Sequence, residues 1–208
     1  MITQGQELEI LQRLLGKQHI ERLTADKLAG KAHWRWNRGE HLEAAVLFDA
    51  AARKSAEEIQ QVRPARDNTF NYRVRAGVTF RLAGEHERAW PILMEATTFD
   101  WNAAGIPEDS HFTEWAFVEM LYVVAERNDA AGFSKLFRQA TIRGAELNFP
   151  FPSIHPKQEL LLELCSNLGL AKEFAQVVSR IEEQRGKVPA RLAKRIGDLM
   201  SAISEHRP

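Results

Sequence analysis

Apolar side chains recur along most of the chain at the three- and four-residue spacing of an amphipathic helix. Leu8, Leu11 and Leu15 form one such stripe near the beginning. Sustained alternation of polar and apolar residues, which indicates a half-buried strand, is missing. The Asn-Gly and Asp-Gly pairs that favour tight β-hairpins are missing as well. The pattern therefore predicts an all-α protein.

One helical pattern repeats along the sequence. The segment around Gly39, RGEHLEAAVLFDAA, returns around Gly84 as AGEHERAWPILMEA, 45 residues later. Weaker copies with the same spacing follow at Asn128 and Gly169, at further offsets of 44 and 41 residues. We expect the glycine to take the left-handed conformation that ends the first helix of a hairpin. Small residues on either side of the turn should let the two helices approach closely.

This pattern resembles the tetratricopeptide repeat family over roughly residues 25–184. It departs from the family in its period, which is 41–45 residues rather than about 34, and in its incomplete first-helix aromatics. The resemblance implies an all-α, right-handed superhelix of about four stacked antiparallel helix hairpins. Apolar stripes outside the repeats predict N- and C-terminal capping helices. The expected single domain covers 1–208, with hairpins at 25–62, 69–99, 111–143 and 155–184 and capping helices at 3–16 and 189–204.

Charge and composition argue for a cytoplasmic protein without a membrane or nucleic-acid partner. The 28 basic residues balance the 28 acidic ones, so no bulk attraction to nucleic acid or to an anionic membrane is expected. The first residues lack the basic flank and apolar run of a signal peptide. The apolar windows are too short to span a bilayer. We therefore expect a soluble, cytoplasmic chain.

The sequence holds no recognisable catalytic or metal-binding motif, so we expect no catalytic residue, no metal and no cofactor. None of the seven histidines pairs with another at the four-residue spacing of a metalloprotease helix. Cys165, the only cysteine, falls in an apolar helical run and is interpreted as a small buried hydrophobe. One alternative is kept: a metal-dependent enzyme using the loop around His111, where Asp100 and Asp109 could serve as further ligands.

The resemblance implies a concave groove lined by the first helix of each hairpin. In the family, clamps for a C-terminal carboxylate use lysine and asparagine where this chain has Ala29 and His33, so no such clamp is expected. Trp36 and Trp115 have a second interpretation as core residues, because large aromatic side chains serve both roles. The implied groove residues are His33, Trp36, Asn37, Asn71, Arg81, Trp115, Tyr122 and Glu163.

A second candidate surface is the edge formed by the two long links between hairpins. These links carry aromatic residues that loops do not ordinarily need, and prolines that stiffen them. Our hypothesis is that Trp101, together with Phe149 or Phe151, is exposed and contacts a partner or a second copy in a homodimer. The alternative is that these rings fold back and seal the interfaces between hairpins.

These observations predict a non-enzymatic protein- or peptide-binding module with another protein or peptide as partner. A bacterial toxin-neutralising inhibitor of the immunity type is one version of this function, and a peptide-sensing or scaffold adaptor is the other. The metal-dependent enzyme remains the alternative from a different class.

Overall fold

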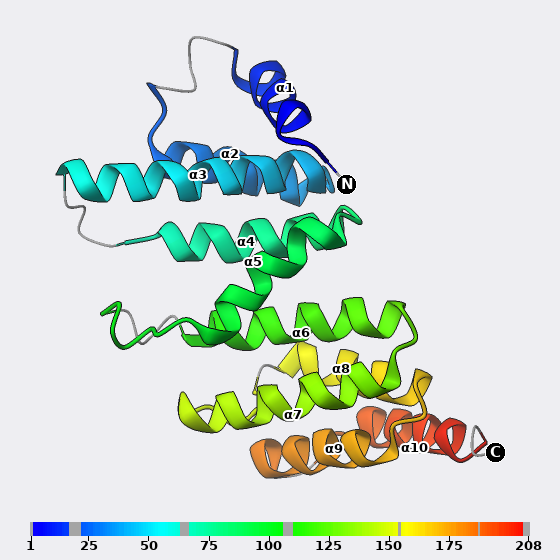
Figure 1. Cartoon of the computed structure of the whole chain (residues 1–208). Coiled ribbons are helices and arrows are strands. Elements are labelled where there is room, and N and C mark those ends of the chain that lie inside the picture. Colours follow the sequence, from blue (N-terminus) through cyan, green and yellow to red (C-terminus); the bar gives the residue numbers. More distant parts are fainter. Residues whose placement is uncertain are drawn as a thin grey trace. The chain divides into compact units, whose positions relative to one another are not determined.

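A computed structural model shows a chain built from α-helices (Figure 1). It describes residues 2–16, 22–62, 67–105, 110–153, 155–186 and 188–205. Within these ranges no residue belongs to a strand. The prediction of an all-α protein is therefore confirmed.

The helices occupy nearly the bounds expected from the sequence. The largest difference is at α7, which continues to Glu146, beyond the expected end at residue 143. The helices are α1 (Gln4–Leu15), α2 (Ala25–Asn37), α3 (His41–Val62), α4 (Thr69–Leu82), α5 (His86–Thr98), α6 (His111–Glu126), α7 (Ala130–Glu146), α8 (His155–Asn167), α9 (Ala171–Arg185) and α10 (Ala190–Glu205).

The chain divides into two compact units, Met1–Ala116 and Phe117–Pro208, and the division falls within α6. In the first unit, α3 packs against α1, α2 and α4, and α4 also packs against α5. In the second unit, α8 packs against α9, and α10 contacts both of these helices. The single domain over 1–208 stays a prediction.

The turns between paired helices share one backbone geometry. Gly39, Gly84, Asn128 and Gly169 have φ values of 75°, 79°, 54° and 67°. This is the left-handed region, which glycine enters without steric cost and asparagine tolerates better than most residues. In each turn the next residue donates its N–H to a carbonyl five positions earlier: Glu40 to Arg35, Glu85 to Phe80, Asp129 to Val124, and Leu170 to Cys165. The expected left-handed glycine is therefore confirmed, and Asn128 serves the same purpose.

At the start of some helices, a side chain caps a backbone N–H group of the first turn. Thr24 accepts a hydrogen bond from the backbone N–H of Lys27 at the start of α2. Asp129 accepts one from the N–H of Gly132 at the start of α7, at 2.8 Å. Asn68 occupies the N-cap position of α4, but its side chain makes no capping hydrogen bond. The local capping signals in the sequence therefore mark helix starts, although the hydrogen bond does not form at every one.

Small residues lie where paired helices approach most closely. Ala44, Ala89 and Ala140 are all fully buried. A Cβ atom added at Gly77 of α4 would lie 3.0 Å from side-chain carbons of both Ile92 and Leu93 of α5. These helices therefore pack at a distance that a larger side chain would not permit.

Replacing Ala89 with leucine should destabilise the fold by about 1–3 kcal/mol, because the added carbons have no space between α4 and α5. Urea denaturation of the wild type and of Ala89→Leu measures the difference. Ala175→Leu is a matched control, since Ala175 lies exposed on α9 and its replacement should change the stability by no more than about 0.5 kcal/mol. Equal unfolding midpoints for the two variants would contradict the assigned helix contact.

Candidate functional site

The expectation that Trp101 is exposed is wrong. Its side chain is fully buried, and its indole N–H donates a 2.7 Å hydrogen bond to the hydroxyl of Thr113. The rings of Phe70, Phe99 and Phe112 lie around it, with centroid distances of 5.2, 4.7 and 6.0 Å. Burying the ring and satisfying its only donor is more favourable than leaving it in water. Trp101 is therefore a core residue of the first unit.

The second long link also places an aromatic ring in the core. Phe151 is 4% exposed and packs against Phe117 and Phe137, with centroid distances of 6.4 and 5.4 Å. Of the two alternatives in our hypothesis, an exposed Phe149 or an exposed Phe151, the second is therefore wrong. Phe149 is only half-buried, so it is the one ring of the predicted edge that keeps a solvent-accessible surface. Residues Ile106 and Ile154 of these links lie outside the described residues.

Three of the predicted groove residues form one cluster in the first unit. His33 stacks on Trp36 at a centroid distance of 6.1 Å, and Trp36 stacks on Trp115 at 5.9 Å. The ring of Phe48 packs edge-to-face against both, with centroid distances of 4.9 Å to His33 and 6.0 Å to Trp36. All three predicted residues are half-buried. The structure therefore combines the two interpretations of the tryptophans, since each ring packs against its neighbours and keeps an accessible face.

The remaining predicted groove residues lie on α2, α4, α6 and α8 and differ in exposure. Asn37 is the exposed last residue of α2, and Arg81 is half-buried near the end of α4. Asn71 is buried, and its amide donates to the side chain of Asn68 at 3.4 Å. Tyr122 and Glu163, both half-buried, belong to the second unit, where Glu163 forms an ion pair with Arg195.

Sequence reasoning missed Arg75 of α4, which belongs to the cluster, and Tyr72 of the same helix, which interacts electrostatically with Arg75. The hydroxyl of Tyr72 donates a 2.5 Å hydrogen bond to Asp26 of α2. The guanidinium of Arg75 lies over the rings of Phe112 and Trp115, 5.5 and 5.7 Å from their centroids. The predicted residue on this part of α4 was Asn71, one position before Tyr72. Tyrosine and arginine are enriched at binding hot spots, and this preference was the available signal.

The pKa values of two ionisable side chains here, His33 and Tyr72, are shifted from their ordinary values. Burial lowers the pKa of His33, and the positive charge of Arg75 lowers it further. Burial also raises the pKa of Tyr72, as do its hydrogen bond to Asp26 and the negative charge of that carboxylate. At neutral pH the cluster therefore presents a neutral imidazole, a neutral phenol and one guanidinium.

The most exposed aromatic side chain described is one that the sequence reasoning did not select. Trp34 is 54% exposed, although it directly follows the half-buried His33 on α2. The guanidinium groups of Arg35 and Arg38 lie 4.9 and 4.6 Å from its ring centroid. Both arginines form ion pairs with Glu40, and these hydrogen bonds, from Arg38 and then Arg35, hold the pKa of Glu40 below its usual value. The Trp34 ring is thus exposed, and the two arginines beside it are held by their ion pairs with Glu40.

Beside Trp34 lies a hollow of about 530 Å³, which we call the Trp34 groove. Its apolar lining comes from leucines 14, 15, 23 and 47, and a Cβ atom added at Gly30 would meet no other atom within 4 Å. Lys27 and Lys31 lie at its rim, and neither forms an ion pair with any residue that the structure describes. The groove is therefore apolar inside and positively charged at its edge.

The described residues bring no three histidine, cysteine, aspartate or glutamate side chains together in a cluster that could hold a metal ion. Asp109, one of the ligands considered from the sequence, lies outside those residues. Cys165 is fully buried, and burial, with a further contribution from Glu173, raises the pKa of its thiol far above the usual range. The interpretation of Cys165 as a small buried hydrophobe is consistent with this environment.

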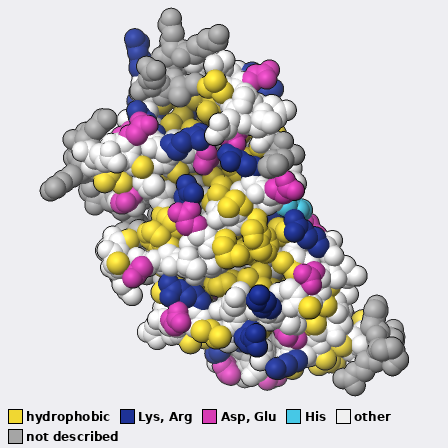
Figure 2. Space-filling model, viewed as in Figure 1, with side chains coloured by type: hydrophobic (Ala, Val, Ile, Leu, Met, Phe, Trp, Pro, Cys, Tyr) yellow, Lys and Arg dark blue, Asp and Glu magenta, His cyan; other side chains and the backbone are white. Residues whose placement is uncertain are grey.

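Comparisons with known proteins give no match to a family model, to a curated protein or to a solved structure. No helix within the described ranges is long and apolar enough to cross a membrane. Figure 2 shows positive, negative and hydrophobic side chains interspersed over the visible face, as the balanced charge of the sequence leads one to expect.

The lowered pKa of His33 predicts that its protonation destabilises the fold. The unfolded state takes up this proton near a pH of about 6.5, whereas the folded state does so only at lower pH, so stability should fall as the pH drops below about 6.5. Urea denaturation at about pH 7.5 and about pH 5 should show a smaller loss for His33→Phe than for the wild type. The other histidines are the same in both proteins, so any contribution they make cancels in this comparison. An identical loss in both would show that His33 is not the responsible group.

Proposed function

We propose that this chain is a non-enzymatic module that binds a segment of another protein or peptide. The observation that carries the proposal is Trp34, a large aromatic side chain exposed beside an apolar hollow. Tryptophan is the residue type most enriched among binding hot spots. Leaving its ring in water forgoes the favourable burial that the other aromatic residues of this unit obtain.

The neighbourhood of Trp34 reduces the cost of binding. The two arginines over its ring are tied to one carboxylate, Glu40, so little further side-chain ordering is needed when a partner covers the indole. The leucine-lined hollow offers space for an apolar side chain next to the ring. Lys27 and Lys31 at the rim favour carboxylates on the same partner. The expected ligand is therefore a segment that presents an apolar side chain between acidic residues.

The cluster of His33, Trp36, Tyr72, Arg75 and Trp115 is proposed as a second contact surface for the same partner. Its rings are ordered by stacking on one another, and its accessible aromatic faces and guanidinium match the composition of binding hot spots. The first unit would thus contact its ligand through two aromatic surfaces that involve α2.

We further propose the finer architecture implied by the tetratricopeptide resemblance, a right-handed superhelix of four stacked hairpins with a capping helix at each end. The four turns have the same left-handed conformation and the same backbone hydrogen bond. This similarity supports the proposal, because similar turns favour similar hairpins. An experimental structure is the test. Hairpins that do not stack in the same orientation along the chain would contradict the proposal.

Two biological settings fit this function, both in the cytoplasm. A toxin-neutralising inhibitor of the immunity type would restore growth to cells that express the toxin encoded beside its gene. A peptide-sensing or scaffold adaptor would have no such effect and would instead bind a secretion or regulatory protein encoded nearby. Co-expression with the neighbouring gene products distinguishes the two.

Replacing Trp34 with alanine should weaken partner binding by about 2 kcal/mol or more, as expected of a hot-spot residue. The partner is first identified by affinity purification from the native host with mass spectrometry, and its affinity is then measured by titration calorimetry. Leu8→Ala is the matched control, because Leu8 is 52% exposed on α1 but does not line the groove. This control should cost less than about 1 kcal/mol. If both variants bind the partner equally well, Trp34 is not part of the contact.

A further inference from the structure

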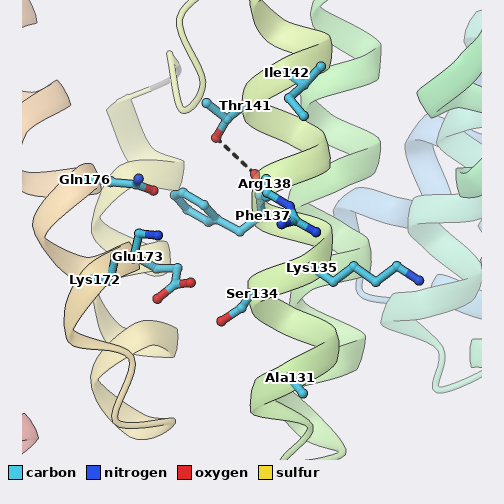
Figure 3. A pocket seen from close by; sticks show the side chains of 10 residues that line it. All are labelled: Ala131, Ser134, Lys135, Phe137, Arg138, Thr141, Ile142, Lys172, Glu173 and Gln176. Atoms are coloured by element: carbon cyan, nitrogen blue, oxygen red, sulfur yellow. Dashed lines mark hydrogen bonds between the residues drawn. The ribbon is translucent and has the colours of Figure 1, made fainter.

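A second hollow, distinct from the Trp34 groove, lies between α7 and α9 in the second unit (Figure 3). It has a volume of about 420 Å³. The ring of Phe137 extends from α7 toward α9 and forms the floor, where it is only 2% exposed. The hydroxyl of Thr141 donates to the carbonyl of Phe137 at 3.0 Å, so this polar group is already satisfied within α7.

The α7 wall of this hollow carries the most exposed of the large hydrophobic side chains described. Ile142 is 56% exposed and lines the hollow near one end. A further hollow of about 290 Å³ begins at Thr141, which lines both, and continues to the half-buried Phe149 and to Pro150. The two hollows share Thr141 and both lie along α7, and we call them together the α7 channel. Of its apolar side chains, Ile142 is exposed and Phe149 is half-buried.

The α7 channel has an excess of positive charge. Lys135 and Arg138 project from α7, and Lys172 from α9, whereas Glu173 is the single acidic residue lining the hollow. None of the three basic side chains forms an ion pair with a residue of the described part of the chain. Figure 2 shows lysine and arginine side chains on the surface that α7 and α9 form. These charges are therefore available to a ligand.

We propose that the α7 channel binds an acidic, amphipathic segment of another protein. Arg138 and Lys172 lie on opposite walls and would pair with carboxylates of the segment, while an apolar side chain of the segment packs against the exposed Ile142. Lys135, Arg138 and Ile142 share one face of α7 at spacings of three and four residues. A bound helix with acidic and apolar residues at the same spacing matches this face.

The chemistry of the channel distinguishes this ligand from nucleic acid. Binding of single-stranded nucleic acid relies on exposed aromatic rings on which bases stack. Along the α7 channel the rings of Phe137 and Phe151 are almost fully buried, and Phe149 alone among the lining rings keeps an accessible surface, so successive bases would find no row of rings to stack on. The exposed apolar side chain is aliphatic. Charge complementarity with an apolar contact therefore favours a protein segment.

Another basic hollow in the same unit provides an internal comparison. It has a volume of about 590 Å³ and is lined by Arg191 and Lys194 of α10. No exposed large hydrophobic side chain lines it, since its leucine, Leu192, is buried. It therefore has the positive charge of the α7 channel without the apolar contact, and the same charge reversal can be made there as a control.

The test uses the full-length chain and a fluorescein-labelled helical peptide made of glutamate, leucine and alanine, with fluorescence anisotropy as the measurement. We expect binding that weakens about tenfold or more in the double variant Arg138→Glu, Lys172→Glu, because two attractive pairs become repulsive. Ile142→Ser should weaken binding about threefold or more through the lost apolar contact. Thermal unfolding confirms that both variants fold, since all three side chains are exposed.

The control double variant Arg191→Glu, Lys194→Glu changes the net charge equally and should retain the affinity of the wild type to within about twofold. Because the Trp34 groove is proposed to take a similar ligand, Arg138→Glu, Lys172→Glu is also measured in a Trp34→Ala background, where the loss it causes should persist independently of the function proposed for the first unit. Equal binding of a peptide with glutamine in place of glutamate would overturn the proposal. So would a larger loss in the α10 control, or self-association of the protein that Ile142→Ser abolishes, since the channel would then bind a second copy.

Discussion

The left-handed conformation of four turn residues is the constraint on which the arrangement of helices depends. At Gly39, Gly84, Asn128 and Gly169 the backbone reverses within a few residues, and one hydrogen bond closes each turn. The next helix must then pack against the one before it, since the connection is too short to lead elsewhere. Close packing in turn requires small side chains at the contact, as at Ala89 and Gly77. The short turn thus requires both a left-handed turn residue and small side chains where the paired helices meet.

The long links that follow α5 and α7 are held in place by buried aromatic rings rather than by a turn conformation. Trp101 and Phe151 follow α5 and α7, and both rings lie in the interior of their units. Trp101 can do so because Thr113 accepts its indole hydrogen bond and in turn donates to the carbonyl of Ala96 at 3.0 Å. An aromatic ring in a link therefore indicates packing when a partner for its polar atom is within reach. Phe149, whose neighbours cover it less, borders the α7 channel instead.

The Trp34 groove and the α7 channel, two of the three surfaces proposed to bind a partner, share one combination of features. Each combines an apolar hollow with basic side chains at the rim, and each has one exposed hydrophobic residue, Trp34 in the first unit and Ile142 in the second. Apolar contact supplies affinity, whereas the charges select acidic ligands and speed their approach. A chain with zero formal net charge can hold two such basic sites because its acidic residues lie elsewhere, many in ion pairs with arginine.

The sequence by itself determined the helices, their bounds and the turns, because glycine conformation, capping and apolar spacing act over a few neighbouring residues. The resemblance to tetratricopeptide repeats led to the expectation that His33, Trp36 and Trp115 line one groove, and their rings do lie together, although the groove itself stays a prediction. Only the tertiary structure decided that Trp101 is buried, that Trp34 is exposed, and that Arg75 lies over the ring of Trp115. Exposure depends on which distant side chains cover a residue, and a helix rotated by one position changes its covered face. Such contacts join residues far apart in the chain, so no local pattern records them.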